Sequence, residues 1–180
     1  MNLNEKRIAF FDLDGTLIET VSGKTFAEDV TDFRIKKNVL DKIKEMKSLR
    51  IVCIVTNQGG IPEYTSKKDF EAKLKGIQEF IQAYLNSYSA YFMSDDDPEV
   101  FAYYCDSLDK SNPNRKPNTG MLQQFLDDKL KYATSEMTDR ANMLMVGDAS
   151  GKPSQFSDSD KKCAENFGID YLDVDDFLNQ

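Results

Sequence analysis

The sequence predicts an α/β fold, a three-layer arrangement around a Rossmann-like parallel sheet, in a single domain that covers residues 1–180. Short apolar runs of strand length recur along the chain and alternate with longer stretches of helical spacing. This alternation is typical of a mostly parallel sheet with helices on both faces. A chain of 180 residues ordinarily forms one domain and can bury a sizeable core.

Taken in order, the apolar runs and the amphipathic stretches define the expected elements. Strands are expected at residues 8–11, 51–55, 90–93, 143–146 and 169–172. Helices are expected at residues 36–49, 66–85, 122–130, 161–167 and 173–178, with a short helix around 100–108. Ser66 and Asp69 have the spacing of a capping box, and Thr119 is a candidate helix cap. Residues 17–32 lack a clear period, which predicts a loop or small flap.

Composition excludes several classes of protein. The net charge of -8 argues against a general nucleic-acid coat or a basic membrane surface. No apolar run reaches the roughly 18 residues of a membrane span, and residues 1–7 lack the apolar core of a signal peptide. Three widely spaced cysteines indicate reduced thiols and a cytoplasmic protein, with the nucleus as the alternative. The absence of histidine argues against zinc sites and histidine-based catalysis.

The chemistry begins at the end of the first predicted strand. Asp12 and Asp14 follow the apolar run, and residues two apart in an extended chain point to the same face. Gly15 then allows a sharp turn. Because two carboxylates this close repel each other, one keeps its proton unless a cation compensates. A hard divalent metal that takes oxygen ligands fits this arrangement.

The Asp-x-Asp pattern occurs three more times, starting at Asp95, Asp158 and Asp173. None of these follows an apolar run and precedes Gly-Thr, as Asp12 does. We therefore expect them to lie in solvated loops or to cap helices.

Three further polar clusters come later in the chain, and the carboxyl ends of parallel strands are where ligands bind. Thr56 and Asn57 directly follow the strand at 51–55, where a hydroxyl and backbone amides can hold a phosphoryl oxygen, although an ordinary loop start is the alternative. Lys116 precedes a proline that restricts its backbone, so it can offer a fixed positive charge, whereas a lone surface lysine is usually solvated. Asp148 follows the strand at 143–146.

In order, these clusters resemble the four motifs of the haloacid-dehalogenase superfamily of phosphohydrolases. The residues that carry the resemblance are Asp12-Leu13-Asp14-Gly15-Thr16, Thr56, Lys116-Pro117 and Gly147-Asp148. Asp160 either supplies a second acid of the fourth motif or caps a helix.

A narrower resemblance is to the phosphatase domain of polynucleotide kinase 3'-phosphatases and to stand-alone DNA 3'-phosphatases. It rests on Ser22-Gly23-Lys24-Thr25-Phe26, Thr56-Asn57-Gln58, Arg115-Lys116-Pro117, Gly120-Met121 and Val146-Gly147-Asp148-Ala149. It covers residues 8 to 177. The sequence contains no phosphate-binding loop of the kinase type, so we expect no kinase half.

The resemblance implies a Mg2+-dependent phosphomonoester hydrolase that forms an aspartyl-phosphate and removes 3'-phosphates from nucleic-acid ends. The implied catalytic residues are Asp12 as nucleophile, Asp14 as acid and base, and Thr56 and Lys116 as charge stabilisers. The implied metal ligands are Asp12, the backbone carbonyl of Asp14, and Asp148. The implied substrate contacts are Asn57, Lys24 and Arg115. We further expect a monomer with an open site and no large cap domain.

Two departures from the family pattern bear on the substrate. After Gln58-Gly59-Gly60-Ile61 the family usually carries a basic residue, and this chain has Pro62-Glu63-Tyr64. Residues 94–114 are also longer and more acidic than the resemblance suggests. Both argue against duplex binding and favour short single strands or frayed ends.

Two alternatives stay open. One is a phosphatase of small phosphate esters, of the histidinol-phosphate or heptose-bisphosphate type. Those relatives typically carry a Cys/His zinc loop between the second and third motifs, where this chain has only Cys105 and no histidine. The other is a catalytically degenerate fold that acts as a binding module, against which the presence of both Asp12 and Asp14 argues.

Overall fold

The computed structural model describes residues 1–24, 27–86, 97–131, 133–155 and 157–180. Its central sheet has five strands in the order β5-β4-β1-β6-β7, and every pair is parallel. The strands are β1 (Ile8–Phe11), β4 (Ile51–Asn57), β5 (Glu99–Cys105), β6 (Met143–Gly147) and β7 (Asp170–Asp173). The three-layer fold with a parallel sheet is confirmed.

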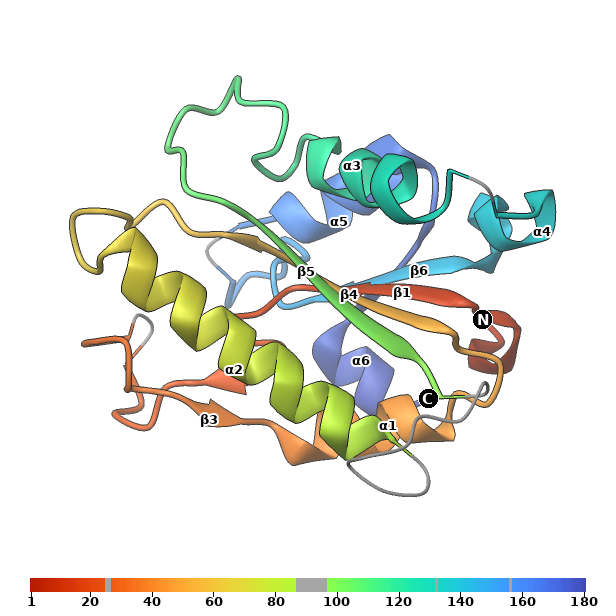
Figure 1. Cartoon of the computed structure of the whole chain (residues 1–180), viewed down its shortest axis with the longest axis horizontal. Coiled ribbons are helices and arrows are strands. Elements are labelled where there is room, and N and C mark those ends of the chain that lie inside the picture. Colours follow the sequence, from red (N-terminus) through yellow and green to blue (C-terminus); the bar gives the residue numbers. More distant parts are fainter. Residues whose placement is uncertain (25–26, 87–96, 132, 156) are drawn as a thin grey trace.

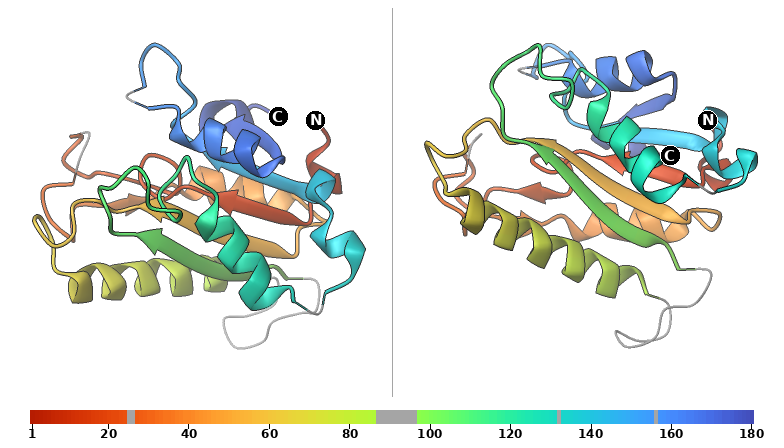
Figure 2. Two further views of the ribbon diagram at one scale, coloured as in Figure 1. Left: turned by 90° about the horizontal axis from the view of Figure 1, so that it is seen from above. Right: turned by 45° about the horizontal axis from the view of Figure 1, so that its top comes forward.

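Helices cover both faces of this sheet (Figure 1). One face carries α1 (Lys37–Glu45), α2 (Lys67–Leu85) and α6 (Val174–Leu178). The opposite face carries α3 (Gly120–Lys129) and α5 (Ser159–Phe167). The turned views in Figure 2 show the same division, with α3 and α5 together across the sheet from α2.

Strand β1 lies at the centre and is buried on both faces, which explains its continuous apolar run. The Phe10 ring meets Phe125 of α3 edge-on, with centroids 5.6 Å apart. The Phe11 ring points to the other face and meets Phe177 of α6 at 5.7 Å. Side-chain alternation along this one strand therefore joins the two halves of the core.

Parallel pairing brings the carboxyl ends of the central strands to one edge. Phe11 of β1 pairs with Ile54 of β4 and with Val146 of β6. The loops that follow these strands gather at this edge, on the left in Figure 1. Asp12, Thr56 and Asp148 end or directly follow a strand here, whereas Lys116 lies farther along the loop after β5.

Most predicted elements agree with the structure, with shifts at their ends. α1 ends at Glu45 rather than near residue 49, and β4 continues through Asn57, so Thr56 and Asn57 belong to the strand. The capping role of Ser66 is confirmed, because its side chain accepts a hydrogen bond from the Asp69 amide at 3.1 Å. Thr119 occupies the N-cap position of α3, but its side chain makes no cap hydrogen bond.

The predicted helix around residues 100–108 is wrong. Residues Glu99–Cys105 form β5, the edge strand, which pairs with β4 from Glu99 opposite Ile51 to Cys105 opposite Asn57. As an edge strand, β5 is only partly buried along most of its length, so its sequence lacks the continuous apolar run of the inner strands. The strand expected at 90–93 lies outside the described residues.

The expected flap contains a small antiparallel pair, β2 (Ile18–Glu19) with β3 (Arg34–Ile35). Asp32 organises its loop by accepting hydrogen bonds from the amide and the hydroxyl of Ser22, at 2.8 and 2.6 Å. The sequence predicted neither α4 (Ser135–Thr138) nor the short 3-10 helices η1 (Leu3–Glu5) and η2 (Arg140–Asn142). In the part of the chain that the structure describes, no helix has the length and apolar character needed to cross a membrane.

Candidate active site

A buried lysine and two buried aspartates meet at the carboxyl edge of the sheet. Lys116 Nζ lies 2.5 Å from Asp12 Oδ1 and 2.8 Å from Asp160 Oδ1. Lys116 is 3% exposed and Asp160 is 1% exposed, so these charges interact with little screening by water. The sequence left Asp160 open between an acid of the fourth motif and a helix cap. The structure places it in the first turn of α5 with its carboxylate on Lys116.

Asp12, Asp148 and Asp160 form a carboxylate cluster. One oxygen atom from each lies within 4.8 Å of the other two, which is a spacing suited to a shared metal ion. Two glycines make this approach possible. A Cβ atom on Gly15 would overlap the Asp148 carboxylate, and one on Gly147 would overlap the Asp160 carboxylate. Gly15 also has a φ of 80°, which L side chains rarely adopt.

The electrostatics of the cluster favour a bound cation. Burial raises the pKa of Asp12 well above its usual range, and the charge of Asp160 adds to this effect against the opposing charge of Lys116. Burial and Asp160 together raise the pKa of Asp148 to about 6. Burial works to lower the pKa of Lys116, but Asp12 and Asp160 raise it above its usual value, so the lysine stays charged.

Asp14 lies outside this cluster and is held by a different residue. Gln58 Nε2 donates hydrogen bonds to Asp14 Oδ2 at 2.6 Å and to Thr56 Oγ1 at 2.9 Å. Thr56 is buried and Asp14 is exposed to solvent. The Asp14 carboxyl is therefore open to solvent and separate from the carboxylate cluster, so a metal ligand from this residue would have to be its main-chain carbonyl.

The three residues expected to contact the substrate lie in different settings. The Asn57 side-chain amide donates to and accepts from the main chain of Lys116, so it already has two partners within the protein. Arg115 Nη1 donates to the Ser107 carbonyl oxygen at 2.7 Å, and its guanidinium borders the loop after β4. Lys24 is exposed on the flap and forms an ion pair with Glu28.

Lys36, at the base of the flap, is a site residue that the sequence did not single out. Its Nζ donates to the Gly15 carbonyl oxygen at 2.8 Å, and its charge works to lower the pKa of nearby Asp148. No motif marks it, because it lies at the amino end of α1 and its contact with Gly15 joins residues that are distant in the chain.

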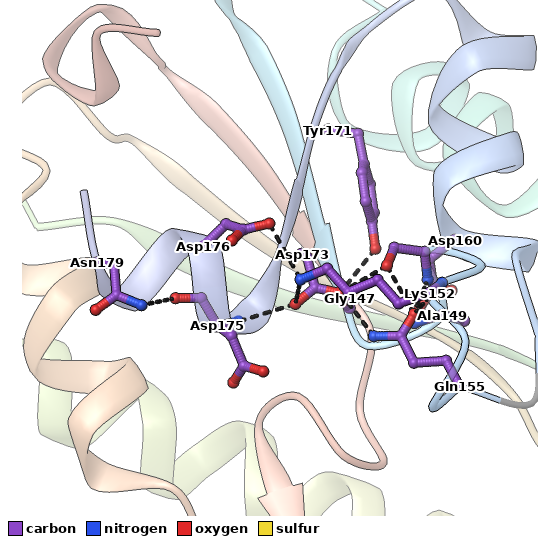
Figure 3. A network of polar contacts seen from close by, with 11 residues as sticks. Gly147, Ala149, Lys152, Gln155, Asp160, Tyr171, Asp173, Asp175, Asp176 and Asn179 are labelled. Atoms are coloured by element: carbon purple, nitrogen blue, oxygen red, sulfur yellow. Dashed lines mark hydrogen bonds and ion pairs between the residues drawn. The ribbon is translucent and has the colours of Figure 1, made fainter.

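Asp173 holds the loop that carries Asp148 (Figure 3). Its carboxylate accepts hydrogen bonds from Ser150 Oγ and Gln155 Nε2, both at 2.7 Å, and forms an ion pair with Lys152 at 2.8 Å. Asp173 also caps α6, which is one of the two roles that the sequence left open for it. Its link to the Asp148 loop was not predicted, since the two segments are distant in the chain.

Comparison with known proteins identifies the family. A sequence model described as polynucleotide kinase 3 phosphatase matches residues 7–178. The chain belongs to the polynucleotide kinase 3 phosphatase family. This agrees with the narrower of the two resemblances drawn from the sequence.

Two relatives of this polynucleotide kinase 3 phosphatase chain are curated proteins from yeasts. The bifunctional polynucleotide phosphatase/kinase of Schizosaccharomyces pombe is 33% identical over 96% of this chain. The chain spans only 38% of that protein's length. The polynucleotide 3'-phosphatase of Saccharomyces cerevisiae is 30% identical over 89% of this chain and 82% of its own length.

A solved structure gives the same fold. The D,D-heptose 1,7-bisphosphate phosphatase of B. bronchiseptica, complexed with magnesium and phosphate, superposes with a TM-score of 0.61. The match covers 92% of this chain and 78% of that structure at 17% sequence identity. At 17% identity this similarity supports the fold of the present chain and says nothing of its substrate.

Proposed function

We propose that this chain is a Mg2+-dependent phosphomonoester hydrolase that removes the 3'-phosphate from nucleic-acid ends through an aspartyl-phosphate intermediate. The observation that carries the proposal is the contact between Asp12 and Lys116 beside the buried carboxylate of Asp160 and the half-buried one of Asp148, in a member of the polynucleotide kinase 3 phosphatase family. A carboxylate nucleophile next to a fixed cation is the minimal arrangement for phosphoryl transfer to an enzyme.

The donor set fits Mg2+. Asp12, Asp148 and Asp160, with the main-chain carbonyl of Asp14, would offer only oxygen ligands, which hard divalent cations prefer. The sequence contains no histidine, which argues against a zinc centre. When bound, Mg2+ would offset the repulsion between the nucleophilic carboxylate and the phosphate dianion.

Each step of the reaction has a residue to perform it. Asp12 attacks phosphorus, the bond from phosphorus to the 3' oxygen breaks, and Asp14 gives its proton to that oxygen. Asp14 then takes a proton from water, whose oxygen attacks the same phosphorus and releases inorganic phosphate from Asp12. Gln58 holds the Asp14 carboxyl during both transfers. Lys116 and Thr56 stabilise negative charge on the transferring group.

A substrate panel tests the proposal. The purified chain with Mg2+ is given 3'-phosphorylated oligonucleotides, 5'-phosphorylated oligonucleotides and a sugar phosphate, and released phosphate is measured. We expect the highest kcat/KM on the 3'-phosphorylated ends. Turnover of the sugar phosphate alone would move the assignment to small phosphate esters, and no turnover of any substrate would favour a binding module.

A further inference from the structure

Two strongly exposed apolar side chains flank the candidate active site. Tyr64, in the loop between β4 and α2, is 79% exposed, and Leu108, in the loop between β5 and α3, is 67% exposed. They are the two most exposed large apolar side chains in the described part of the chain. Both loops leave the same edge of the sheet, because β4 and β5 are parallel neighbours.

The two side chains border the same short backbone segment, Gly59 and Gly60. Leu108 lies over Gly59, so that a Cβ atom at position 59 would overlap its side chain. The Tyr64 ring lies beside Gly60, where a Cβ atom would come 3.2 Å from Tyr64 Cδ2. The Tyr64 amide also donates to the Gly60 carbonyl oxygen at 2.8 Å. We call the surface formed by Gly59, Gly60, Tyr64 and Leu108 the apolar platform.

One covalent link and one side-chain contact connect the apolar platform to the catalytic groups. Gln58, directly before Gly59, contacts Asp14 at 2.6 Å. Arg115 lies beside Gly59, with Nη1 placed 3.2 Å from where a Cβ atom would stand, and directly precedes Lys116. The residue before the platform thus contacts Asp14, and the guanidinium at its border belongs to the residue before Lys116, which contacts Asp12.

We propose that the apolar platform binds the base of the 3'-terminal nucleotide, with Tyr64 stacking on the base and Arg115 facing the adjoining phosphodiester. This inference rests on the proposed function. Every base has a π face, so stacking on an aromatic ring holds single strands without regard to sequence. The 31 acidic residues outnumber the 23 basic ones, which disfavours an extended set of phosphate contacts, so affinity for a strand has to come largely from its bases.

A double comparison of protein and substrate tests this. We measure kcat/KM for wild type and Tyr64→Ala on a short single-stranded 3'-phosphorylated oligonucleotide, on the same strand with an abasic terminal nucleotide, and on p-nitrophenyl phosphate. Phe80→Ala is the matched control. It removes another exposed aromatic ring, 40% exposed, from α2. Position 80 is about 20 Å along the helix from its start at Lys67.

We expect Tyr64→Ala to lower kcat/KM on the intact strand, relative to p-nitrophenyl phosphate, by about 5- to 100-fold. Removal of the terminal base should cost wild type a similar factor and Tyr64→Ala little. Phe80→Ala should keep the wild-type ratio of kcat/KM on the intact strand to kcat/KM on p-nitrophenyl phosphate. If wild type cleaves the intact strand and Tyr64→Ala has the same ratio of the two kcat/KM values, base binding by the platform is refuted and the proposed function stands. If wild type hydrolyses p-nitrophenyl phosphate and neither strand, both proposals are wrong.

Discussion

The side-chain amide of Asn57 forms two hydrogen bonds with the main chain of Lys116. Asn57 Oδ1 accepts a hydrogen bond from the Lys116 amide at 2.9 Å, and Asn57 Nδ2 donates to the Lys116 carbonyl oxygen at 3.0 Å. This pair ties the end of β4 to the loop after β5. It fixes the backbone from which the Lys116 ammonium reaches Asp12.

Asn57→Ala should therefore lower kcat by about 10- to 100-fold, because the Lys116 ammonium loses its fixed position. The effect should pass through Lys116. In a Lys116→Ala background, the same change at position 57 should cost little, which a double-mutant cycle measures. Additive losses in the two variants would instead indicate that Asn57 contacts the substrate directly.

Asp12→Asn should reduce turnover by roughly 1000-fold or more, because an amide is a far weaker nucleophile than a carboxylate. Acid quenching after reaction with a 32P-labelled substrate should trap labelled protein from wild type and none from the variant. Thermal unfolding of the variant is the control for folding. Wild-type turnover in folded Asp12→Asn would refute the mechanism.

Removal of divalent cations with a chelator should stop activity, and Mg2+ should restore it. Binding should also raise the melting temperature, because a cation relieves repulsion among Asp12, Asp148 and Asp160. Calorimetry of the metal-free protein with added Mg2+ measures this without any substrate. Restoration by Zn2+ and not by Mg2+ would contradict the assigned donor set.

Asp173→Asn should lower the free energy of unfolding by about 1–2 kcal/mol at neutral pH, because charged hydrogen bonds become neutral ones. Burial works to raise the pKa of Asp173, but the bonds from Lys152, Gln155 and Ser150 outweigh it and the pKa is lowered. A lowered pKa in the folded state means that the carboxylate stabilises the fold above its unfolded pKa of about 3.9. That stabilisation is lost as the pH falls below this value.

Urea unfolding of wild type and Asp173→Asn at several pH values checks the sign. The difference in the free energy of unfolding between the two proteins should be constant from about pH 6 to 8 and should shrink toward about pH 3. If this difference in the free energy of unfolding grows in acid, the carboxylate does not stabilise the loop through its charge.

Salt should affect catalysis on single-stranded ends only weakly. With about one phosphate contact beyond the scissile group, kcat/KM should fall by about threefold or less between roughly 50 and 200 mM salt. Measurement on a 3'-phosphorylated oligonucleotide tests this. A fall in kcat/KM of about 1000-fold over this range would indicate an extended basic surface.

The sequence by itself determined the layers of the fold and most of the candidate site. Burial on both faces makes the inner strands apolar over their full length, and this pattern is local, so β1, β4 and β6 could be located directly. Parallel strands end at one edge, so the polar residues after them had to converge. The placement of Asp12, Thr56 and Asp148 at one site could be predicted from these two facts.

The tertiary structure decided what local pattern could not. The edge strand β5 has mixed burial, and its assignment depends on pairing with β4, which no local period reports. The choice of Asp160 as a partner of Lys116, and the grip of Asn57 on the same lysine, join residues that are distant along the chain. Hydrogen bonds of this kind depend on which loops meet in space, and that is fixed only once the sheet order is formed.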